Sequence, residues 1–273
     1  MTIFSVDPAR CEKDDLCLTV CPLRIIRAGA DGYPAVTPER EAYCIACGHC
    51  AAICPRGAIT LRGTPGAALA PLDRSLDVGF EAAAQLLKAR RSVRHFKPEP
   101  LSRAQIVEVL DVTRWAPTGT NTQSLKWTVV DGFSRVRELA GLVVDWMRGV
   151  AAADPAMGKR LNLPGVIRAF EEGKDPVCRG APHVVAVHAG RESVTPAEDA
   201  VIGLTYLELA AFARGYGTCW AGFVALGGKS HKPILDFLGI PPEEKLYGAV
   251  MLGRPRYRFA RLPERKPASV AWR

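Results

Sequence analysis

Apolar residues recur at helical spacing through four long segments of the chain. The spacing predicts helices over residues 78–90, 103–115, 134–150 and 196–215. Ser102 is a suitable N-cap for the second helix, because its hydroxyl can accept a hydrogen bond from a free amide of the first turn. The fourth helix starts with Pro196 and ends at Gly215, residues typical of those two positions. Short apolar runs over 127–131, 182–188 and 246–252 predict strands, so the fold class is α+β, dominated by helices.

The first 62 residues follow a different pattern, in which loop, short helix and strand occur twice. A stretch of small residues, glycine and proline over 62–71 then lacks any apolar period, as linkers do. The sequence therefore predicts a first domain over residues 1–64, a linker over 65–75 and a second domain over 76–273. Within the second domain, residues 151–180 are rich in Ala, Gly, Pro and charge, which suits a lid or a helical excursion over a site.

Four cysteines stand at the spacing C-x2-C-x2-C-x3-C-P, which is the ligand run of bacterial ferredoxins. Three thiolates two residues apart can wrap a tight loop around three corners of an iron–sulfur cube, and the fourth ligates the other cluster. Zinc sites usually place their cysteines in separated pairs instead. The run of Cys44, Cys47, Cys50 and Cys54 therefore predicts iron–sulfur ligation, with the first three cysteines on one cluster and Cys54 on another.

A second run lies upstream, at the spacing C-x5-C-x3-C-P, and its second ligand place falls on Asp14. A carboxylate is a harder ligand than a thiolate and holds iron less well in a sulfur cage. We therefore expect this cluster to be either a 4Fe–4S cube with one labile iron or a 3Fe–4S cluster; the alternative, with Asp14 as a solvated loop residue, stays open. The expected ligand sets are Cys11, Asp14, Cys17 and Cys54 for one cluster, and Cys44, Cys47, Cys50 and Cys21 for the other.

Charge and composition narrow the class of protein. The 273 residues are 48% hydrophobic and 23% charged, as in ordinary soluble globular proteins. The net charge of +8 lies wholly in residues 63–273, since residues 1–62 hold seven basic and seven acidic side chains. No helix-turn-helix pattern or basic run with interleaved aromatic residues accompanies this charge, so we expect an anionic cofactor or substrate and no nucleic acid.

The use of cysteine indicates a reducing compartment. Seven of the nine cysteines belong to the two runs, which argues against a disulfide framework. The first residues lack the basic start and apolar stretch of a signal peptide, and no apolar run approaches the ~20 residues of a membrane helix. We expect a cytoplasmic protein that does not associate with membranes.

Four segments of the second domain carry groups suited to a flat, anionic cofactor. Arg90, Arg91 and Arg94 stand close together, and guanidinium groups pair bidentately with phosphate oxygens. Residues 116–123 offer hydroxyl and amide groups around Gly119, residues 215–223 form a glycine-rich stretch, and residues 261–267 form a second basic cluster.

With these segments in this order, residues 75–273 resemble the nitroreductase family of FMN enzymes. The whole chain resembles the subgroup that carries an N-terminal two-cluster ferredoxin domain. The resemblance rests on Arg-Arg-Ser-x-Arg and Ala-Pro-Thr-Gly-x-Asn-x-Gln in combination. It implies a ferredoxin-like domain followed by an FMN domain in which helices flank a mixed sheet, and a homodimer with FMN at the subunit interface.

The resemblance also implies which residues hold FMN. One subunit would supply Arg90, Arg91, Ser92 and Arg94, with Arg94 nearest the pyrimidine end of the flavin, where it would stabilise the hydroquinone. The other subunit would supply Pro117, Thr118, Gly119, Asn121 and Gln123. The amides of Ala221 and Gly222 would face the flavin, and Arg265 and Lys266 would meet the phosphate. Ser124 stands where the family often has proline, which affects the substrate side of the site.

The implied function is an oxidoreductase that relays electrons from iron–sulfur clusters to FMN and then to a small organic acceptor such as a nitro compound, a quinone or an activated alkene. The sequence has no G-x-G-x-x-G unit of a dedicated nicotinamide site. By the resemblance, the electron donor would be NAD(P)H acting directly at the flavin, or an external carrier such as reduced ferredoxin. Two alternatives remain: an electron-transfer or redox-sensing protein that serves a protein partner, and reductive dehalogenation on the same scaffold.

Overall fold

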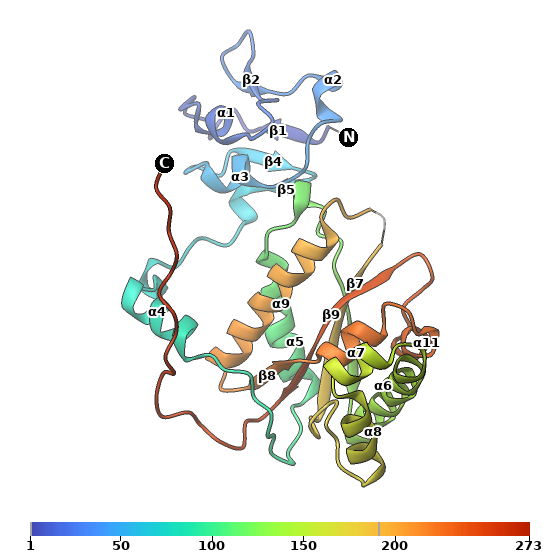
Figure 1. Cartoon of the computed structure of the whole chain (residues 1–273). Helices are drawn as coiled ribbons and strands as arrows, with labels where there is room; N and C mark the ends of the chain where they lie inside the picture. The colour runs from blue at the N-terminus through green and yellow to red at the C-terminus, as the bar shows by residue number, and fades with distance from the viewer. Residues whose placement is uncertain (1, 191) are drawn as a thin grey trace. The chain divides into compact units, whose positions relative to one another are not determined.

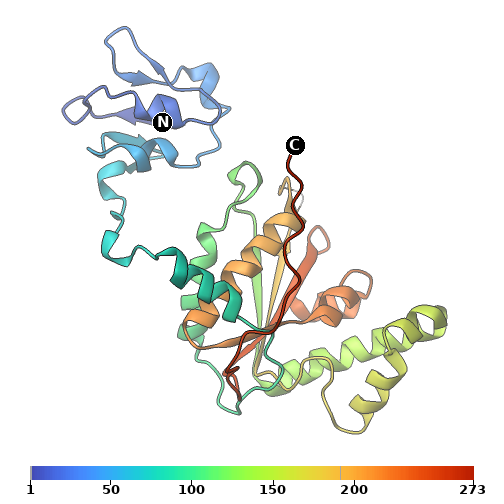
Figure 2. The ribbon, with the colours of Figure 1, turned by 60° about the vertical axis from the view of Figure 1, so that its left-hand side comes forward.

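The computed structural model describes residues 2–190 and 192–273. Contacts between Cα atoms divide the chain into two compact units. The first runs through Asp77 and includes Thr120–Thr122; the second comprises Val78–Gly119 and Gln123–Arg273. Figures 1 and 2 show the elements of each unit in chain order. In the described residues, no helix is long and apolar enough to cross a membrane.

A small antiparallel sheet in the first unit pairs the start of the chain with residues about 55 positions later. Strand β1 (Phe4–Val6) pairs antiparallel with β4 (Ile59–Leu61), and β5 (Thr64–Pro65) continues this sheet. Between them, β2 (Arg27–Ala28) and β3 (Pro34–Ala35) form a second antiparallel pair. The helices of this unit are short: α1 (Leu16–Val20), α2 (Pro38–Glu41) and α3 (His49–Ile53).

The second unit contains the long helices that the apolar spacing predicted. They are α4 (Phe80–Ala89), α5 (Arg103–Asp111), α6 (Phe133–Ala153) and α9 (Pro196–Ala213). Helix α5 starts with a capping box: Ser102 accepts from the amide of Gln105, and the Gln105 side chain accepts from the amide of Ser102. A 3-10 turn over Val112–Trp115 extends α5.

A four-stranded sheet in the order β6-β7-β9-β8 lies at the centre of the second unit. Its strands are β6 (Lys126–Asp131), β7 (His183–Ala189), β8 (Gly217–Trp220) and β9 (Lys245–Gly253), all paired antiparallel. An isolated parallel bridge pairs Ser92, outside the four strands, with Thr218 of β8.

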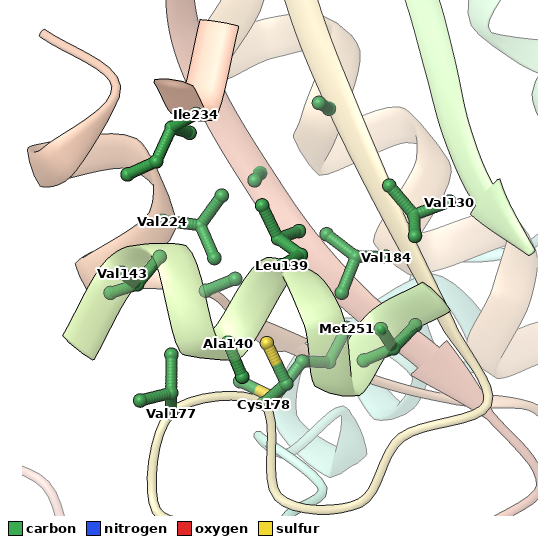
Figure 3. Close-up of a cluster of buried hydrophobic side chains, with 14 of the residues drawn as sticks. Val130, Leu139, Ala140, Val143, Val177, Cys178, Val184, Val224, Ile234 and Met251 are labelled. Carbon is green, nitrogen blue, oxygen red and sulfur yellow. The ribbon is translucent and has the colours of Figure 1, made fainter. Parts of the chain in front are cut away.

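Helices cover both faces of this sheet. Successive side chains of a strand point to opposite faces, and β7 is buried along its whole length. Val184 and Ala186 pack with α6, whereas Val185 and Val187 pack with α9 and α5. Figure 3 shows the first of these cores, with Leu139 of α6 among the labelled side chains. The predicted α+β class, with helices flanking the sheet, is confirmed.

Two segments differ from expectation in detail. Strand β8 occupies residues that the sequence presented only as a glycine-rich stretch. The segment 151–180, whose structure the sequence left open, carries α7 (Pro155–Arg160) and α8 (Leu163–Glu171). Two further helices, α10 (Gly222–Gly227) and α11 (Lys232–Leu238), lie between β8 and β9. The tail after Gly253 has no helix or strand among the described residues, apart from a bridge between Phe96 and Pro255.

Candidate functional site

The two cysteine runs of the first unit share one backbone conformation. Each residue of the first run has a counterpart 33 positions later. Lys13 and its counterpart Ala46 both have positive φ, at 56° and 50°, as do Asp15 and Gly48, at 58° and 78°. Positive φ is uncommon outside glycine, so the match reflects the same loop built twice. Asp14 therefore occupies the loop position that Cys47 occupies in the second run.

The helices that follow these loops place the remaining cysteines alike. Cys17 in α1 and Cys50 in α3 are each the second helical residue, and both are buried. Cys21 and Cys54 come directly after the two helices, with nearly identical extended backbone angles (φ −69°, ψ 111° and φ −68°, ψ 114°). The third and fourth ligand positions of each run therefore lie at the two ends of one short helix.

One cavity of the first unit contains a complete predicted ligand set. It encloses about 440 Å³ including its opening, and apart from the cysteines its lining is mainly apolar, with Ile3, Phe4, Ile25 and Ile26 among the residues. In the part of the chain that the structure describes, no three His, Cys, Asp or Glu side chains could hold a single metal ion. Four sulfur donors around an apolar cavity suit a multi-iron cluster. The four cysteines that line it are Cys21, Cys44, Cys47 and Cys50.

Three members of the other predicted set, Cys11, Asp14 and Cys17, lie near one another. Burial raises the pKa of the Cys17 thiol to about 11, and the charges of Asp14 and Cys11 beside it add to the increase. Burial likewise raises the pKa of Cys50 to about 11, with Cys47 and Cys44 beside it. Ligation to iron would oppose these shifts, since the ligand is the thiolate. The sulfur of Cys54 accepts a hydrogen bond from the amide of Ala58 at 3.4 Å.

Asp14 has a local role in the present geometry. Its Oδ1 accepts a hydrogen bond from the amide of Leu16 at 3.1 Å, which stabilises the start of α1. One carboxylate oxygen therefore has a protein partner, and Oδ2 remains as the second donor atom toward a metal.

In the second unit, the arginine segment runs beside β8. The amide of Val93 donates to the carbonyl of Thr218 at 2.8 Å, next to the bridge between Ser92 and Thr218. This pairing brings together two predicted site segments that lie more than a hundred residues apart in the sequence. Arg94 then lines a cavity of about 780 Å³, including its opening, together with Cys219, Trp220 and Gly222.

This cavity is cationic, because Arg179 also lines it. Sequence reasoning did not identify Arg179, which lies in the loop between α8 and β7. It has a positive φ of 60° and follows Cys178, a fully buried residue. Two guanidinium groups beside Trp220 and Phe223 can bind an anionic, flat molecule.

The three arginines predicted to act together do not share one cavity. Arg91 and Val93 line a different cavity, of about 860 Å³ including its opening, with Tyr257 and Phe259 of the tail. The guanidinium of Arg91 lies over the ring of Phe259, 5.8 Å from its centroid. The side chains of this extended segment alternate, so Arg91 and Arg94 are separated.

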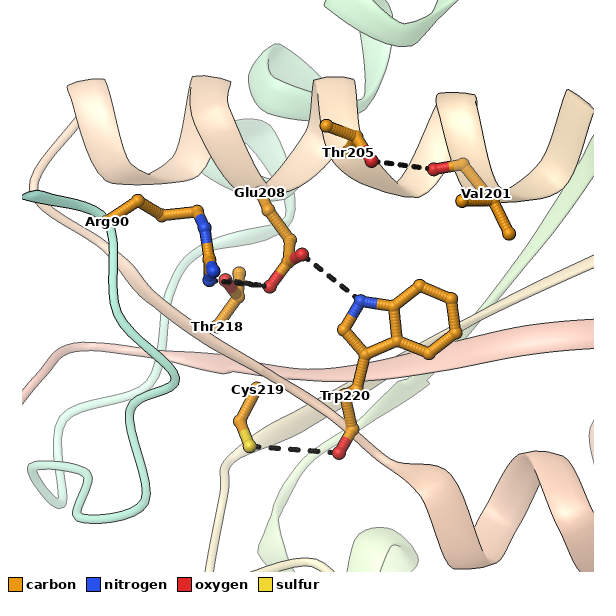
Figure 4. A network of polar contacts seen from close by, with 7 residues as sticks. All are labelled: Arg90, Val201, Thr205, Glu208, Thr218, Cys219 and Trp220. Carbon is orange, nitrogen blue, oxygen red and sulfur yellow. Dashed lines mark hydrogen bonds and ion pairs between the residues drawn. The ribbon is translucent and has the colours of Figure 1, made fainter. Parts of the chain in front are cut away.

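Arg90 belongs to a buried polar network centred on Glu208 of α9. Arg90 Nη1 donates to Glu208 Oε1 at 3.3 Å, the Thr218 hydroxyl donates to the same oxygen at 3.0 Å, and Trp220 Nε1 donates to Oε2 at 3.1 Å. Figure 4 shows these three groups converging on the carboxylate. Glu208 was not predicted from the sequence. The one signal for it was its charge, in the middle of an otherwise apolar helix face.

The loop over residues 116–123 is held by a second buried carboxylate. The amide of Gly119 donates to Asp199 Oδ1 at 2.9 Å, and the hydroxyls of Ser193 and Thr195 donate to the same carboxylate at 3.0 and 2.8 Å. Thr118 Oγ1 accepts from the amide of Gln123 at 3.0 Å. Asp199 is only 2% exposed and was also missed.

The same loop has an unusual backbone. Thr120, Asn121 and Gln123 all have positive φ, at 50°, 56° and 49°, and none is glycine. Such conformations cost of order 1–2 kcal/mol each and cluster at functional sites. Pro117, the remaining predicted residue of this loop, is exposed.

The two amides predicted to face a flavin are not equivalent. The amide of Ala221 donates to the carbonyl of Ala249 at 2.8 Å, so it already has a protein partner. Gly222 and Phe223 start α10, where amides lack intrahelical acceptors, and neither amide has a hydrogen-bond partner among residues 2–190 and 192–273. The backbone amides of Gly222 and Phe223 are therefore available to a ligand.

Arg265 and Lys266 lie in the exposed tail. Arg265 Nη1 donates to the adjacent carbonyl of Glu264 at 2.9 Å. The described structure of one chain does not bring these two residues into the cavity that Arg94 lines.

A third buried carboxylate stabilises the far edge of the sheet. His188 Nδ1 lies 2.5 Å from Glu244 Oε2, and Lys126 pairs with the other oxygen of Glu244. The ammonium group of Lys126, and then His188, hold the pKa of Glu244 below its usual value. This cluster is remote from the arginine segment in sequence and was not predicted.

Comparison with known proteins gives two family matches. The model of the nitroreductase family matches residues 87–254, and that of the 4Fe–4S binding domain matches residues 40–60. A solved nitroreductase with bound FMN from Desulfitobacterium hafniense has the same fold, with a TM-score of 0.55 and 22% identity, covering 69% of this chain and 96% of that chain.

Two curated relatives are similar in sequence. A 4-nitrobenzoate reductase of Pseudomonas putida is 35% identical over 79 residues, which are 29% of this chain and 32% of that enzyme. This match thus spans about a third of the reductase. A 5,6-dimethylbenzimidazole synthase of Rhodospirillum rubrum is 26% identical over 196 residues, covering 67% of this chain and 85% of that protein. The chain belongs to the nitroreductase family of oxidoreductases and carries a 4Fe–4S binding domain near its N-terminus.

Proposed function

We propose that this protein is an FMN-dependent oxidoreductase that transfers electrons from iron–sulfur clusters to a small aromatic nitro compound. The observation that carries the proposal is the cavity lined by Cys21, Cys44, Cys47 and Cys50 in a chain whose other unit is a nitroreductase. The domains would be a ferredoxin-like part over residues 1–64, a linker over 65–75 and a flavin domain over 76–273.

The repeated loop supports two clusters rather than one. Because both runs adopt the same backbone, each can present three ligands to one cluster and a fourth to the other. Asp14 would complete the set of Cys11, Cys17 and Cys54. A carboxylate at that position favours a 4Fe–4S cluster with a labile iron or a 3Fe–4S cluster.

The cavity lined by Arg94 and Arg179 is the proposed place of the flavin ring. When bound there, FMN would supply the two-electron redox chemistry of the reaction. The guanidinium of Arg94 would stabilise negative charge on the reduced ring, as preorganised donors stabilise an oxyanion. The free amides of Gly222 and Phe223 would orient the ring from its edge, and Arg90 and Ser92 would hold the ribityl phosphate.

The remaining proposed contacts come from a second copy of the chain. In a homodimer, the loop of Pro117, Thr118, Gly119, Asn121 and Gln123 would reach the flavin of the partner, and Arg265 and Lys266 would approach a phosphate there. The strained loop and its buried Asp199 support this assignment, since a rigid loop loses little freedom on binding.

Nitro compounds are the favoured acceptor because of the similarity to 4-nitrobenzoate reductase. A nitrobenzoate is flat and anionic, and the cavity combines two guanidinium groups with aromatic side chains. The electron donor would be NADH, NADPH or a reduced ferredoxin.

Anaerobic purification followed by titration tests the proposal. We expect a yellow-brown protein that contains iron, acid-labile sulfide and FMN. One of the three donors should bleach the flavin absorbance, and 4-nitrobenzoate should restore it, with quinones and an activated alkene as comparison acceptors. Protein without flavin would contradict the proposal. Flavin that is reduced but is not reoxidised by any small acceptor would instead favour an electron carrier for a protein partner.

A further inference from the structure

Glu208 is a buried carboxylate within the fold of the flavin unit. Its side chain is 7% exposed, and both oxygens accept hydrogen bonds. A buried carboxylate is costly unless charged and polar partners compensate it. Here one cation, one hydroxyl and one indole N–H do so, from Arg90, Thr218 and Trp220.

These three partners belong to the two segments that meet beside the flavin cavity. Arg90 starts the extended segment that is bridged to β8 through Ser92 and Thr218. Trp220 ends β8, lines the flavin cavity and lies two residues before the free amide of Gly222. A single carboxylate of α9 therefore connects Arg90, at the start of the segment that carries Arg94, to Trp220 of the cavity lining (Figure 4).

Arg90 is partly buried and is oriented by this contact. Its side chain is 29% exposed, and only Nη1 has a protein partner within residues 2–190 and 192–273. The Nε and Nη2 groups remain as donors for an anion. Holding one edge of a guanidinium is the way in which proteins aim the other edge at a ligand.

We propose that Glu208 is a positioning residue of the flavin site, which orients Arg90 and Trp220 and lowers the reduction potential of the bound flavin by its buried negative charge. The proposal rests on the proposed function, because it requires FMN in the cavity lined by Arg94. Charge close to a flavin tunes its potential, and a nearby anion opposes formation of the anionic reduced ring.

The hydrogen-bond pattern predicts what an amide does at this position. Glu208 Oε1 accepts from Arg90 and Thr218, and Oε2 accepts from Trp220. In Glu208→Gln, the amide NH2 must face either the Arg90 guanidinium or the Trp220 indole, and each of these can only donate. One donor is therefore left without an acceptor. In Glu208→Gln/Trp220→Phe the indole donor is absent, so the amide can keep its oxygen toward Arg90.

The test compares FMN affinity and flavin potential in the full-length protein, purified anaerobically. Glu198→Gln is the matched control, because it removes the same charge from an exposed position on α9. Glu208→Gln should bind FMN about tenfold more weakly, since a charge-assisted hydrogen bond is lost. Its flavin potential should rise by about 30 mV, the equivalent of a tenfold change in the ratio of affinities for reduced and oxidised flavin.

The double variant Glu208→Gln/Trp220→Phe separates the effect of side-chain orientation on FMN affinity from the effect of the carboxylate charge on the flavin potential. Relative to Glu208→Gln, it should recover affinity toward the level of Trp220→Phe, but its potential should stay above that of Trp220→Phe. If Glu208→Gln does not fold, as judged by circular dichroism, the comparison of Glu208→Gln/Trp220→Phe with Trp220→Phe decides the question by itself.

The possible failures are distinguishable. Wild-type affinity and potential in Glu208→Gln would overturn the inference alone. Weaker binding without a change in potential would also overturn it, because a merely structural role affects oxidised and reduced flavin equally. A wild-type protein that binds no FMN would overturn the proposed function and this inference with it.

Discussion

Replacement of Asp199 should release the loop over residues 116–123 from helix α9 of the second unit. In Asp199→Ala three donors lose their acceptor: the amide of Gly119 and the hydroxyls of Ser193 and Thr195. Hydroxyls can rotate to other acceptors, whereas the amide cannot. The Ser193 hydroxyl is buried and the other two donors are partly buried, so at about 1–3 kcal/mol for a fully buried donor left unpaired the expected destabilisation is about 3 kcal/mol.

Asp199→Asn is the informative comparison. The asparagine oxygen can keep the bonds from Gly119 and Thr195 at the place of Oδ1, and its NH2 can donate to the hydroxyl of Ser193. Only the charge assistance is lost, which gives an expected cost of about 1 kcal/mol. The two variants should thus differ by about 2 kcal/mol, or roughly 1 M in the urea midpoint for an m-value near 2 kcal/mol/M.

Urea unfolding followed by tryptophan fluorescence measures this difference, and Glu198→Ala, one residue earlier and exposed, is the control. Amide hydrogen exchange adds a local readout, since the Gly119 amide should exchange faster in Asp199→Ala than in Asp199→Asn. Equal destabilisation by both variants would refute the reasoning, because charge rather than the hydrogen-bond pattern would then be the deciding quantity.

Three further predictions concern the other sites. Asp14→Cys should abolish any 3Fe signal in the electron paramagnetic resonance spectrum of the oxidised protein, since four thiolates hold a 4Fe–4S cluster more firmly; a wild-type 3Fe signal that persists in the variant would show that Asp14 is no ligand. Glu244 has a lowered pKa because Lys126 pairs with it, so its contribution to stability is present above pH ~4.5 and is lost as the pH falls through the lower folded pKa. The stability difference between wild type and Glu244→Gln should accordingly shrink as the pH falls below ~4.5, and a difference that grows there would contradict this assignment. Gly217→Ala should destabilise the second unit by about 1–3 kcal/mol, because the added Cβ would lie 2.8 Å from the side chain of Val93; a normal unfolding midpoint would mean that the arginine segment is not packed against β8.

Local signals predicted the parts of the fold that depend on neighbouring residues. Ser102 and Gln105 lie three residues apart and together start α5. Pro196 starts α9, and the apolar run of β7 is buried on both faces of the sheet, as its composition indicated. The cysteine spacing is equally local, and the structure brings Cys21 into the cavity of the three cysteines of the second run.

The parts that were missed depend on contacts between distant residues. Strand β8 has four residues and no apolar alternation of its own; it is a strand because β9 pairs with it. Arg90 and Glu208 are 118 residues apart, and nothing near either residue indicates the ion pair. Arg91 and Arg94 looked like one cluster in the sequence, but an extended backbone directs them to different cavities.

The duplicated loop gives the first unit an internal reference. Residues 11–21 and 44–54 follow the same backbone path, yet one copy has Asp14 where the other has Cys47. Solvent, temperature and preparation are common to both copies within every molecule. Any contrast in iron loss or magnetic behaviour between the two proposed clusters can therefore be traced to the side chains in which the copies differ, the pair of Asp14 and Cys47 among them, without a second protein for comparison.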